Sequence, residues 1–372
     1  RETLVSARGV SAEHAPSLGS DGFFRDEYGS RWPELLAALQ HPKRYAVWEN
    51  PFATDTCCST ILAEHNMVKL PGVSGSTHIW APALAESTPV HGTALPSVRL
   101  PKPPTCAHTG LKLYYPLDFA SALPVLALLA ALRNHPRSQP QQTRVLDACA
   151  APGGKFLLLA GALLHGNPAG TFLTAVEKDM FRFGRLRQNL RLYLPTRTLV
   201  QVRLLAGDTS CPRSRAGDGI PYDAVLVDAP CSSERERLLR AAARTSAADF
   251  GSKTAEASTV PWDPGRARAN AQRQVALLAA ALELAPHGVV VYATCALSSI
   301  ENDDVVAKVL QQAPPGWRSC GGGQADAPWA PEPLGALAAG AAAEATAYGW
   351  QALPDRGGWG PIYWSVLRGP GA

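Results

Sequence analysis

Two cysteines and one lysine-bearing loop are the residues of this chain whose types and spacing can do chemistry. A segment of small residues, DACAAPGGK at 147–155, precedes a helical pattern, and two apolar runs each end in a cysteine, Cys231 and Cys295. A thiolate at such a place can attack an electrophilic carbon when a neighbouring cation, such as Lys155, lowers the pKa of the thiol. The pattern predicts covalent catalysis by one or both cysteines.

Acidic residues follow four of the strand-like runs: Asp147, Glu177, Asp208 and Asp228. Ligands of open α/β sheets bind at the carboxyl ends of the strands, and a carboxylate about 30 residues after the first strand can accept hydrogen bonds from both ribose hydroxyls. Each acid alone would also fit a helix cap. The four in register predict a nucleoside-type ligand across the sheet edge, with small residues of the loop allowing the backbone to approach it.

A thiolate beside a nucleoside-type donor suits methylation of C5 of a cytosine. That carbon is a poor nucleophile until a thiolate adds to C6, after which C5 becomes enamine-like and accepts a methyl group from a sulfonium donor. The loop matches neither GxGxxG nor GxxxxGK[ST], which disfavours dinucleotide and nucleoside triphosphate ligands.

Apolar runs alternate with helical patterns after residue 143, which predicts an α/β fold with a mostly parallel, doubly wound sheet. The predicted strands are 144–148, 171–176, 199–205, 222–227 and 289–293, and the predicted helices are 156–164, 179–193, 266–284 and 300–311. A last run, 361–368, predicts an antiparallel edge strand.

A Pro-rich stretch at 95–105 predicts a boundary between a small N-terminal extension, residues 1–105, and a catalytic domain, residues 106–372. The extension contains a predicted helix at 32–39, and its aromatic residues Trp32, Tyr45 and Trp48 could stack on bases, although a local core is the favoured interpretation. Two insertions, 240–260 and 321–348, are poor in large apolar residues and are expected to be loose.

The composition excludes some classes of protein. The longest apolar run, 122–132, is too short to span a bilayer, so no membrane contact is expected. The net charge of +4 neither requires nor excludes an anionic partner. Eight cysteines without CxxC spacing favour a reducing compartment, and the nine histidines show no metal-ligand spacing, so no metal site is predicted. Cys106, Cys211 and Cys320 are expected to be small core residues.

Three motifs resemble the Sun (Fmu/Nop) family of RNA cytosine-C5 methyltransferases. They are DACAAPGGK at 147–155, VDAPCSS at 227–233 and YATCALSSIEND at 292–303, in the family's order. Four further segments resemble its mitochondrial branch, whose members act on small-subunit ribosomal RNA or a mitochondrial transfer RNA: FRDEYGSRWPELLAALQ, KRYAVWENPFA, YYPLDFASALPVLAL and GPIYWSV.

The resemblance implies a Rossmann-like class I fold and S-adenosylmethionine as the cofactor. It implies RNA, ribosomal RNA or a ribosomal precursor, as the substrate, and the mitochondrial matrix as the location. A helical-repeat protein that delivers the RNA is a further expected partner. No additional RNA-binding module is evident in the sequence, so the choice of target must come from elsewhere in the chain or from a partner.

Carried over by position, the resemblance assigns the nucleophile to Cys295 and the release of the product to Cys231. Asp228 matches the acid that holds the cytosine edge, with Lys155 beside it, and Glu177 replaces the Asp that is usual at its position. The expected cofactor-binding residues are Cys149, Ala150, Ala151, Pro152, Gly153, Gly154, Lys155, Glu177, Arg182, Asp208 and Asp228.

Three alternatives stay open at this point. An assembly factor could keep the fold and bind a ribosomal precursor without chemistry, although the intact motifs favour an enzyme. A DNA cytosine methyltransferase would use Cys231 as the nucleophile, and the TC dipeptide ending at Cys295 disfavours it. Arg182 could belong to a solvated or phosphate-binding helix face with Arg185, Arg187 and Arg191 rather than to the donor site.

Overall fold

A central, mostly parallel sheet organises the protein. The computed structural model describes residues 20–53, 57–70, 78–83, 100–133, 142–166, 170–211, 219–248, 262–320 and 342–371. The strands of the central sheet are β5 (Thr143–Asp147), β6 (Thr171–Glu177), β7 (Val202–Ala206), β8 (Ala224–Asp228), β9 (Val289–Thr294), β10 (Arg318–Ser319), β11 (Glu344–Ala345), β12 (Trp350–Ala352) and β13 (Ile362–Arg368).

Their order is β11-β12-β13-β9-β8-β5-β6-β7, with β10 beside β13. Strands β5 to β9 all run parallel to one another, whereas β13, the other neighbour of β9, is antiparallel to it. The predicted α/β fold and the antiparallel direction of the last strand are therefore confirmed. The expectation that this strand lies at the edge is wrong, because β12 and β11 extend the sheet beyond β13.

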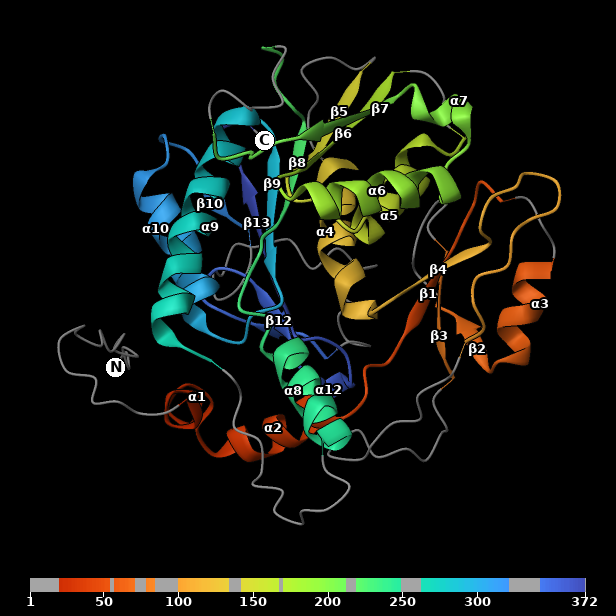
Figure 1. Cartoon of the computed structure of the whole chain (residues 1–372). Helices are drawn as coiled ribbons and strands as arrows, with labels where there is room; N and C mark the ends of the chain where they lie inside the picture. Colours follow the sequence, from red (N-terminus) through yellow and green to blue (C-terminus); the bar gives the residue numbers. More distant parts are fainter. Residues whose placement is uncertain are drawn as a thin grey trace, which may run out of the picture.

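Both faces of the sheet are covered because its strands are apolar on both sides. Along β8, Ala224 and Leu226 belong to the core that contains α4 (Leu123–Arg133) and α5 (Gly154–Leu164). Val225 and Val227 alternate with them and pack with α9 (Pro264–Leu284) and α10 (Asp303–Gln312). Figure 1 shows the sheet between these two layers of helices, with α6 (Met180–Tyr193) on the side of α5.

A second, antiparallel sheet precedes the central one. Its order is β2 (Met67–Lys69), β3 (His78–Pro82), β1 (Ala46–Glu49) and β4 (Tyr114–Leu117), and α3 (Cys57–Glu64) packs against β2. Strand β4 lies beyond residue 105 but pairs with β1, so this sheet includes strands from both sides of the predicted boundary. The division of the chain at residue 105 stays a prediction. Trp48 is fully buried, and a side chain at Gly161 of α5 would meet its ring at 2.7 Å.

The first helices of the described residues pack at the carboxyl end of the central sheet, beside the loop that follows β9. Helices α1 (Ser20–Tyr28) and α2 (Trp32–Gln40) share an apolar cluster with α8 (Glu234–Ala248) and the loop after β9. Trp32 lies in this cluster, so Trp32 and Trp48 are core residues, as the favoured interpretation had it, whereas Tyr45 is 46% exposed.

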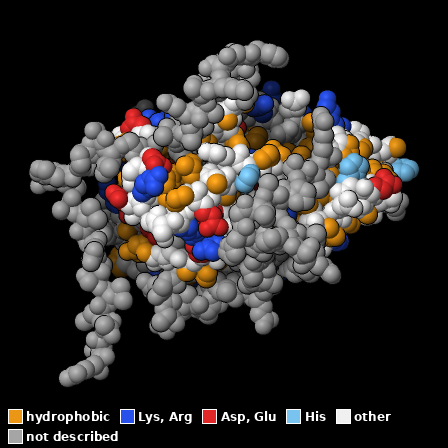
Figure 2. Space-filling view, turned by 90° about the horizontal axis from the view of Figure 1, so that it is seen from below, with side chains coloured by type: hydrophobic (Ala, Val, Ile, Leu, Met, Phe, Trp, Pro, Cys, Tyr) orange, Lys and Arg blue, Asp and Glu red, His pale blue; other side chains and the backbone are white. Residues whose placement is uncertain are grey.

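Ion pairs tie the N-terminal part to the rest of the chain. Arg31 lies between the carboxylates of Asp355 and Glu344, at 2.5 and 2.6 Å. Figure 2, which views the molecule from below, shows basic and acidic side chains close together on the described surface, with hydrophobic side chains among them. None of the helices in the described ranges combines the length and apolar character that crossing a bilayer requires.

Some sequence expectations need correction. Residue 199 ends a short helix, α7 (Thr196–Leu199), so β7 starts at 202 rather than 199. The segment expected to be loose from residue 240 continues α8 as far as 248, because its many alanines favour a helix; residues 249–261 lie outside the described ranges. In 321–348, residues 321–341 lie outside them, and 344–345 form β11. Cys106 and Cys320 are buried as expected, but Cys211 is exposed.

Candidate active site

The loop between β5 and α5 takes its shape from small residues and from α6. Gly153 has a φ of +115°, which a side chain rarely adopts, and a Cβ there would lie 3.2 Å from Leu186 of α6. The carbonyl oxygen of Pro152 accepts a hydrogen bond from Asn189 Nδ2 at 2.7 Å, and that of Ala151 accepts one from Arg182 at 2.5 Å. The tight loop therefore presents its backbone at the carboxyl end of the sheet.

One cavity, of about 400 Å³, lies along the ends of β5, β6 and β7. Cys149, Glu177 and Asp208 contribute to its wall, as do Leu277 and Ala276 of α9. Asp208 accepts hydrogen bonds from Lys178 Nζ at 2.8 Å and from the Ser210 hydroxyl at 2.6 Å. Burial raises the pKa of Asp208, but these hydrogen bonds outweigh it and hold that pKa below its usual value. The cavity thus combines an apolar wall with carboxylates.

The residues of this cavity fit S-adenosylmethionine. Glu177 accepts a hydrogen bond from the Asp179 backbone N–H at 2.8 Å through Oε1, whereas its buried Oε2 accepts none from the described residues and lies 3.7 Å from Arg182. An open carboxylate oxygen at this strand end suits the hydroxyls of a ribose. Leu277 and Ala276 offer the apolar surface that a purine ring needs.

A second cavity, of about 420 Å³, contains both predicted thiols. Cys231, Cys295, Asp228 and Lys155 form part of its wall, and Pro230 lies in the walls of both cavities. The two spaces therefore adjoin at the segment that joins Asp228 to Cys231. A group held in the first cavity can face a base held in the second.

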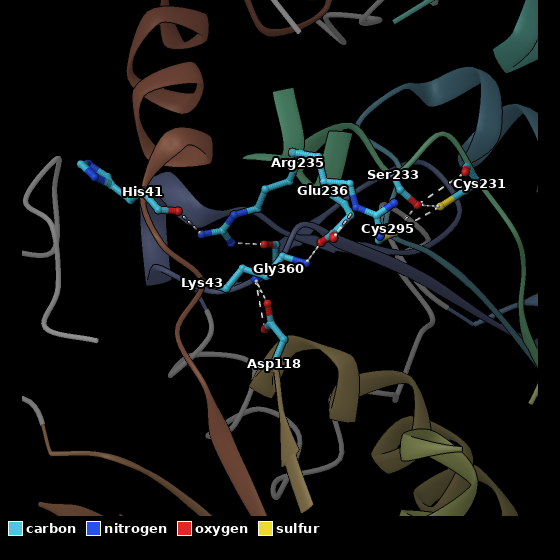
Figure 3. A network of polar contacts seen from close by, with 10 residues as sticks. His41, Lys43, Asp118, Cys231, Ser233, Arg235, Glu236, Cys295 and Gly360 are labelled. Carbon is cyan, nitrogen blue, oxygen red and sulfur yellow. Dashed lines mark hydrogen bonds and ion pairs between the residues drawn. The ribbon is translucent and has the colours of Figure 1, made fainter. Parts of the chain in front are cut away.

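The two thiols are in direct contact. The Sγ atoms of Cys231 and Cys295 lie 3.2 Å apart, and the Ser233 hydroxyl oxygen lies 3.2 Å from the Cys295 sulfur and 3.5 Å from the Cys231 sulfur (Figure 3). The hydrogen bond from Cys231 lowers the pKa of Cys295, burial opposes it, and the hydrogen bond from Ser233 lowers it further. The same contact with Cys295, together with burial, raises the pKa of Cys231. Of the two sulfurs, Cys295 is the one that ionises first.

Lys155 and Asp228 form an ion pair on the same wall. Lys155 Nζ lies 2.7 Å from Asp228 Oδ2, and the side chains are 14% and 29% exposed. Burial lowers the pKa of Lys155, but Asp228 outweighs this effect and raises it, so the ammonium group stays charged. Its charge also favours the thiolate of Cys295.

Residues that follow Cys295 hold both cysteine loops in place. The buried Glu301 accepts hydrogen bonds from the Ser232 backbone N–H at 3.0 Å and from its hydroxyl, directly after Cys231. Asn302 accepts one from Thr294 at 2.6 Å and donates one to the Ala296 carbonyl, on either side of Cys295. The acid and amide of the SSIEND segment therefore fix the two thiols relative to each other.

The structure distributes the sequence-predicted residues over the two cavities. Cys149, Glu177 and Asp208 line the first, whereas Cys231, Cys295, Asp228, Lys155 and Arg182 line the second. Arg182 was expected in the donor site, and the structure places it at the border, between Glu177 and the second cavity. Residues 150–154 are not part of either described wall and shape the loop.

Sequence reasoning gave no role to several residues of the second cavity, among them Lys43, Asp118, Ser233 and Arg235. Asp118 accepts hydrogen bonds from the Gly360 backbone, and Arg235 donates to the carbonyls of Gly360 and His41 (Figure 3). Ser233 could have been found, because it stands two residues after Cys231 in a motif already singled out. Lys43 and Asp118 belong to two of the segments that resemble the mitochondrial branch, but those segments suggest no chemistry for them, and only the fold brings them to the cavity of the thiols.

Several known proteins are similar to this chain in sequence. Residues 136–321, half of the chain, match a family model described as 16S rRNA methyltransferase RsmB/F. A zebrafish (Danio rerio) protein, tRNA (cytosine(34)-C(5))-methyltransferase, mitochondrial, is 33% identical over 79% of this chain and 72% of its own length. The mouse (Mus musculus) 5-cytosine rRNA methyltransferase NSUN4 is 30% identical over 77% of this chain and 71% of its own.

Solved structures show the same fold. A methyltransferase homolog protein from Pyrococcus horikoshii superposes with a TM-score of 0.58 at 20% identity and covers 94% of this chain and 95% of that one. NSun6 from Pyrococcus horikoshii also gives a TM-score of 0.58, at 15% identity, over 94% of this chain and 97% of that one.

Proposed function

The chain belongs to the RsmB/F family of RNA cytosine-C5 methyltransferases, and from this premise we propose that it methylates mitochondrial small-subunit ribosomal RNA through a covalent adduct with Cys295. The protein transfers a methyl group from S-adenosylmethionine to C5 of a cytosine in RNA. We propose Cys295 as the nucleophile, ribosomal RNA as the target and the mitochondrion as the location.

The contact between the two thiols carries the proposal. Cys231 and Cys295 lie 3.2 Å apart in a cavity that shares Pro230 with the cavity of Glu177 and Asp208. One cytosine ring can therefore be within reach of both sulfurs and of a methyl donor at once. A structural pair of buried cysteines would not need an adjoining cavity lined with carboxylates.

The proposed cycle starts from the Cys295 thiolate. Its sulfur adds to C6 of the cytosine, and the electron pair of the C5=C6 bond then makes C5 nucleophilic. Asp228 lies in the same wall, where its carboxylate can accept a hydrogen bond from the cytosine amino group, and Lys155 fixes the direction of that carboxylate. When bound, S-adenosylmethionine supplies the methyl group that C5 accepts.

Release reverses the addition. The proton on C5 leaves to a base, the C5=C6 bond forms again, and the S–C6 bond breaks, returning the pair of electrons to the Cys295 sulfur. Cys231, whose raised pKa keeps it as a neutral thiol, donates a hydrogen bond to that sulfur and so favours its departure. The second thiol therefore acts at the end of the cycle.

The relatives support an RNA target of two kinds. The matched family model and the mouse relative are named for ribosomal RNA, whereas the zebrafish relative is named for cytosine 34 of a transfer RNA and for the mitochondrion. Ribosomal RNA is the proposed target, and transfer RNA is a second candidate that the 33% identity to the zebrafish protein favours.

Bisulfite sequencing of mitochondrial and cytosolic RNA, from cells with and without the protein, tests the proposal. A single cytosine in mitochondrial small-subunit RNA should lose its methyl group without the protein and regain it with the parent chain but not with Cys295→Ala. Loss at a transfer RNA instead would select the second candidate. Loss of ribosome assembly that Cys295→Ala restores in full, with no methylation, would select the assembly-factor role.

A further inference from the structure

The Ser233 hydroxyl lies beside the pair of thiols, within reach of both sulfurs. The hydroxyl oxygen is 3.2 Å from Cys295 Sγ and 3.5 Å from Cys231 Sγ, and it lies in the wall of the cavity that contains both (Figure 3). The neighbouring hydroxyl, that of Ser232, turns to the buried Glu301 instead. Of these two adjacent serines, only Ser233 reaches the sulfurs.

The backbone at Ser233 adopts a conformation that glycine would favour. Its φ is +51°, in the left-handed region, where a residue with a Cβ costs about 1 kcal/mol relative to glycine. Its carbonyl oxygen accepts a hydrogen bond from the Arg237 backbone N–H at 3.1 Å, and this hydrogen bond closes the first turn of α8. Glycine would serve this turn at least as well. The turn alone therefore does not explain the serine, and we attribute its presence to the hydroxyl group.

We propose that Ser233 is a positioning residue for the nucleophile, whose hydroxyl donates a hydrogen bond to Cys295 Sγ and holds that sulfur as an oriented thiolate. This inference rests on the proposed function, in which Cys295 is the atom that adds to C6. The hydroxyl keeps its own proton throughout and is not a base. It stabilises the sulfur anion before the S–C6 bond forms and again when that bond breaks.

The surrounding charges agree with this role. The groups that act on the Cys295 sulfur are the Cys231 thiol, the Ser233 hydroxyl, the Lys155 ammonium, the Asp228 carboxylate and the buried Glu234 carboxyl. Burial and Asp228 disfavour the thiolate, so donors are needed to offset them. Ser233 is the donor that does not itself take part in addition or release, and it can be removed without deleting a reacting atom.

Alkylation of Cys295 by iodoacetamide, measured against pH, tests the role without RNA. Digestion with trypsin places Cys231 in peptide 216–235 and Cys295 in peptide 274–308, so mass spectrometry follows each thiol separately. The variants are Ser233→Ala and Ser233→Gly, with Ser59→Ala, on the exposed side of α3, as the control. Losing a hydrogen bond to a charged sulfur should raise the midpoint of Cys295 alkylation by about one pH unit and slow its alkylation at neutral pH about tenfold.

The two Ser233 variants separate the hydroxyl from the backbone. If the hydroxyl matters, both shift the midpoint of Cys295 alike, and Ser59→Ala does not. If only Ser233→Ala shifts it, the backbone is responsible and the proposal is overturned, as it is if neither variant shifts it. Should Ser233→Ala fail to fold, Ser233→Gly, which suits a φ of +51°, carries the test alone.

The alkylation profiles test the role of Ser233 separately from the proposed function. Methylation retained by Cys295→Ala would remove Cys295 as the nucleophile, whatever the alkylation profiles show. An unchanged alkylation profile would instead remove Ser233 and leave Cys295 in place. In the supporting case, the Ser233 variants also lower the rate of adduct formation at neutral pH, keep the Kd for S-adenosylmethionine, and recover rate as the pH rises.

Discussion

The sulfur atoms of Cys231 and Cys295 lie 3.2 Å apart although 64 residues separate them in the chain. They meet because β8 and β9 are parallel neighbours, so that both cysteine loops leave the sheet at the same edge. The hydrogen bonds of Glu301 and Asn302 then fix the two loops.

Replacement of the two thiols should give opposite results. Cys295→Ala removes the atom that adds to C6, so neither adduct nor methylated RNA should form. Cys231→Ala leaves addition possible and impairs release, so a protein–RNA complex should accumulate as a slow band on a denaturing gel. A trapped complex with Cys295→Ala, and none with Cys231→Ala, would reverse the roles and favour the mechanism expected of a DNA methyltransferase.

Asp208→Ala should weaken the binding of S-adenosylmethionine. The variant removes a carboxylate from the wall of the donor cavity, and loss of a buried hydrogen-bonded contact costs about 1 to 3 kcal/mol, or roughly 5- to 150-fold in Kd. Isothermal titration calorimetry measures the change. Asp26→Ala, the same substitution at an exposed position of α1, is the control. Equal affinities for the two variants would remove Asp208 from the donor site.

Mild oxidation should join the two thiols. Diamide accepts two electrons and two protons as Cys231 and Cys295 form a disulfide, for which the sulfurs must close from 3.2 Å to about 2 Å. Peptides 216–235 and 274–308 should then appear linked, adduct formation should stop, and dithiothreitol should restore it. Affinity for S-adenosylmethionine should persist, because the donor cavity does not include these cysteines. Linkage of peptide 274–308 to a cysteine peptide other than 216–235 would contradict this assignment.

Stability should fall as the pH rises from acidic to neutral. Burial raises the pKa of Asp147 from 3.8 to about 7 and that of Glu234 from 4.5 to about 8. Folded protein therefore binds more protons than unfolded protein between these values, so the stabilisation present below the unfolded pKa is lost as the pH passes through the folded one.

Urea unfolding at several pH values measures this dependence. Glu234→Gln keeps the shape of the neutral carboxyl, so the pH dependence of the free energy of unfolding should become shallower by up to about one proton between the two pKa values. Glu34→Gln, on the exposed side of α2, should leave the slope unchanged. An unaltered slope in Glu234→Gln would show that Glu234 is ionised in the folded protein at neutral pH.

The central sheet and the meeting of the thiols were predictable from the sequence. Long apolar runs identify parallel strands, and the carboxyl ends of such strands must share an edge, so acids and cysteines at those ends come together. Glu177 and Asp208 accordingly line one cavity. These features depend on local patterns and one general rule of topology.

Other features depend on contacts that no local pattern encodes. Strand β2 has three residues and β1 has four, too short to show alternation, and β4 joins them from the far side of the Pro-rich stretch. The reach of Ser233 to the sulfurs depends on a positive φ in a residue other than glycine. Arg182 lies at the border between the two cavities, because its guanidinium donates a hydrogen bond to the Ala151 carbonyl and pairs with the Glu177 carboxylate.

The attachment of the first helix to the loop after Cys295 has a consequence for synthesis of the chain. Tyr28 donates a hydrogen bond to the Leu297 carbonyl, 269 residues later, and Glu27 accepts one from Ser299. At roughly 5 to 20 residues per second, a nascent chain waits about 15 to 50 s between making the two partners. The apolar side chains of Phe24 and Trp32 are without their packing partner Leu297 during that interval. Helices α1 and α2 thus dock fully only after the loop that follows β9 has been made, and a ribosome-bound chain offers an aromatic surface to chaperones during that interval.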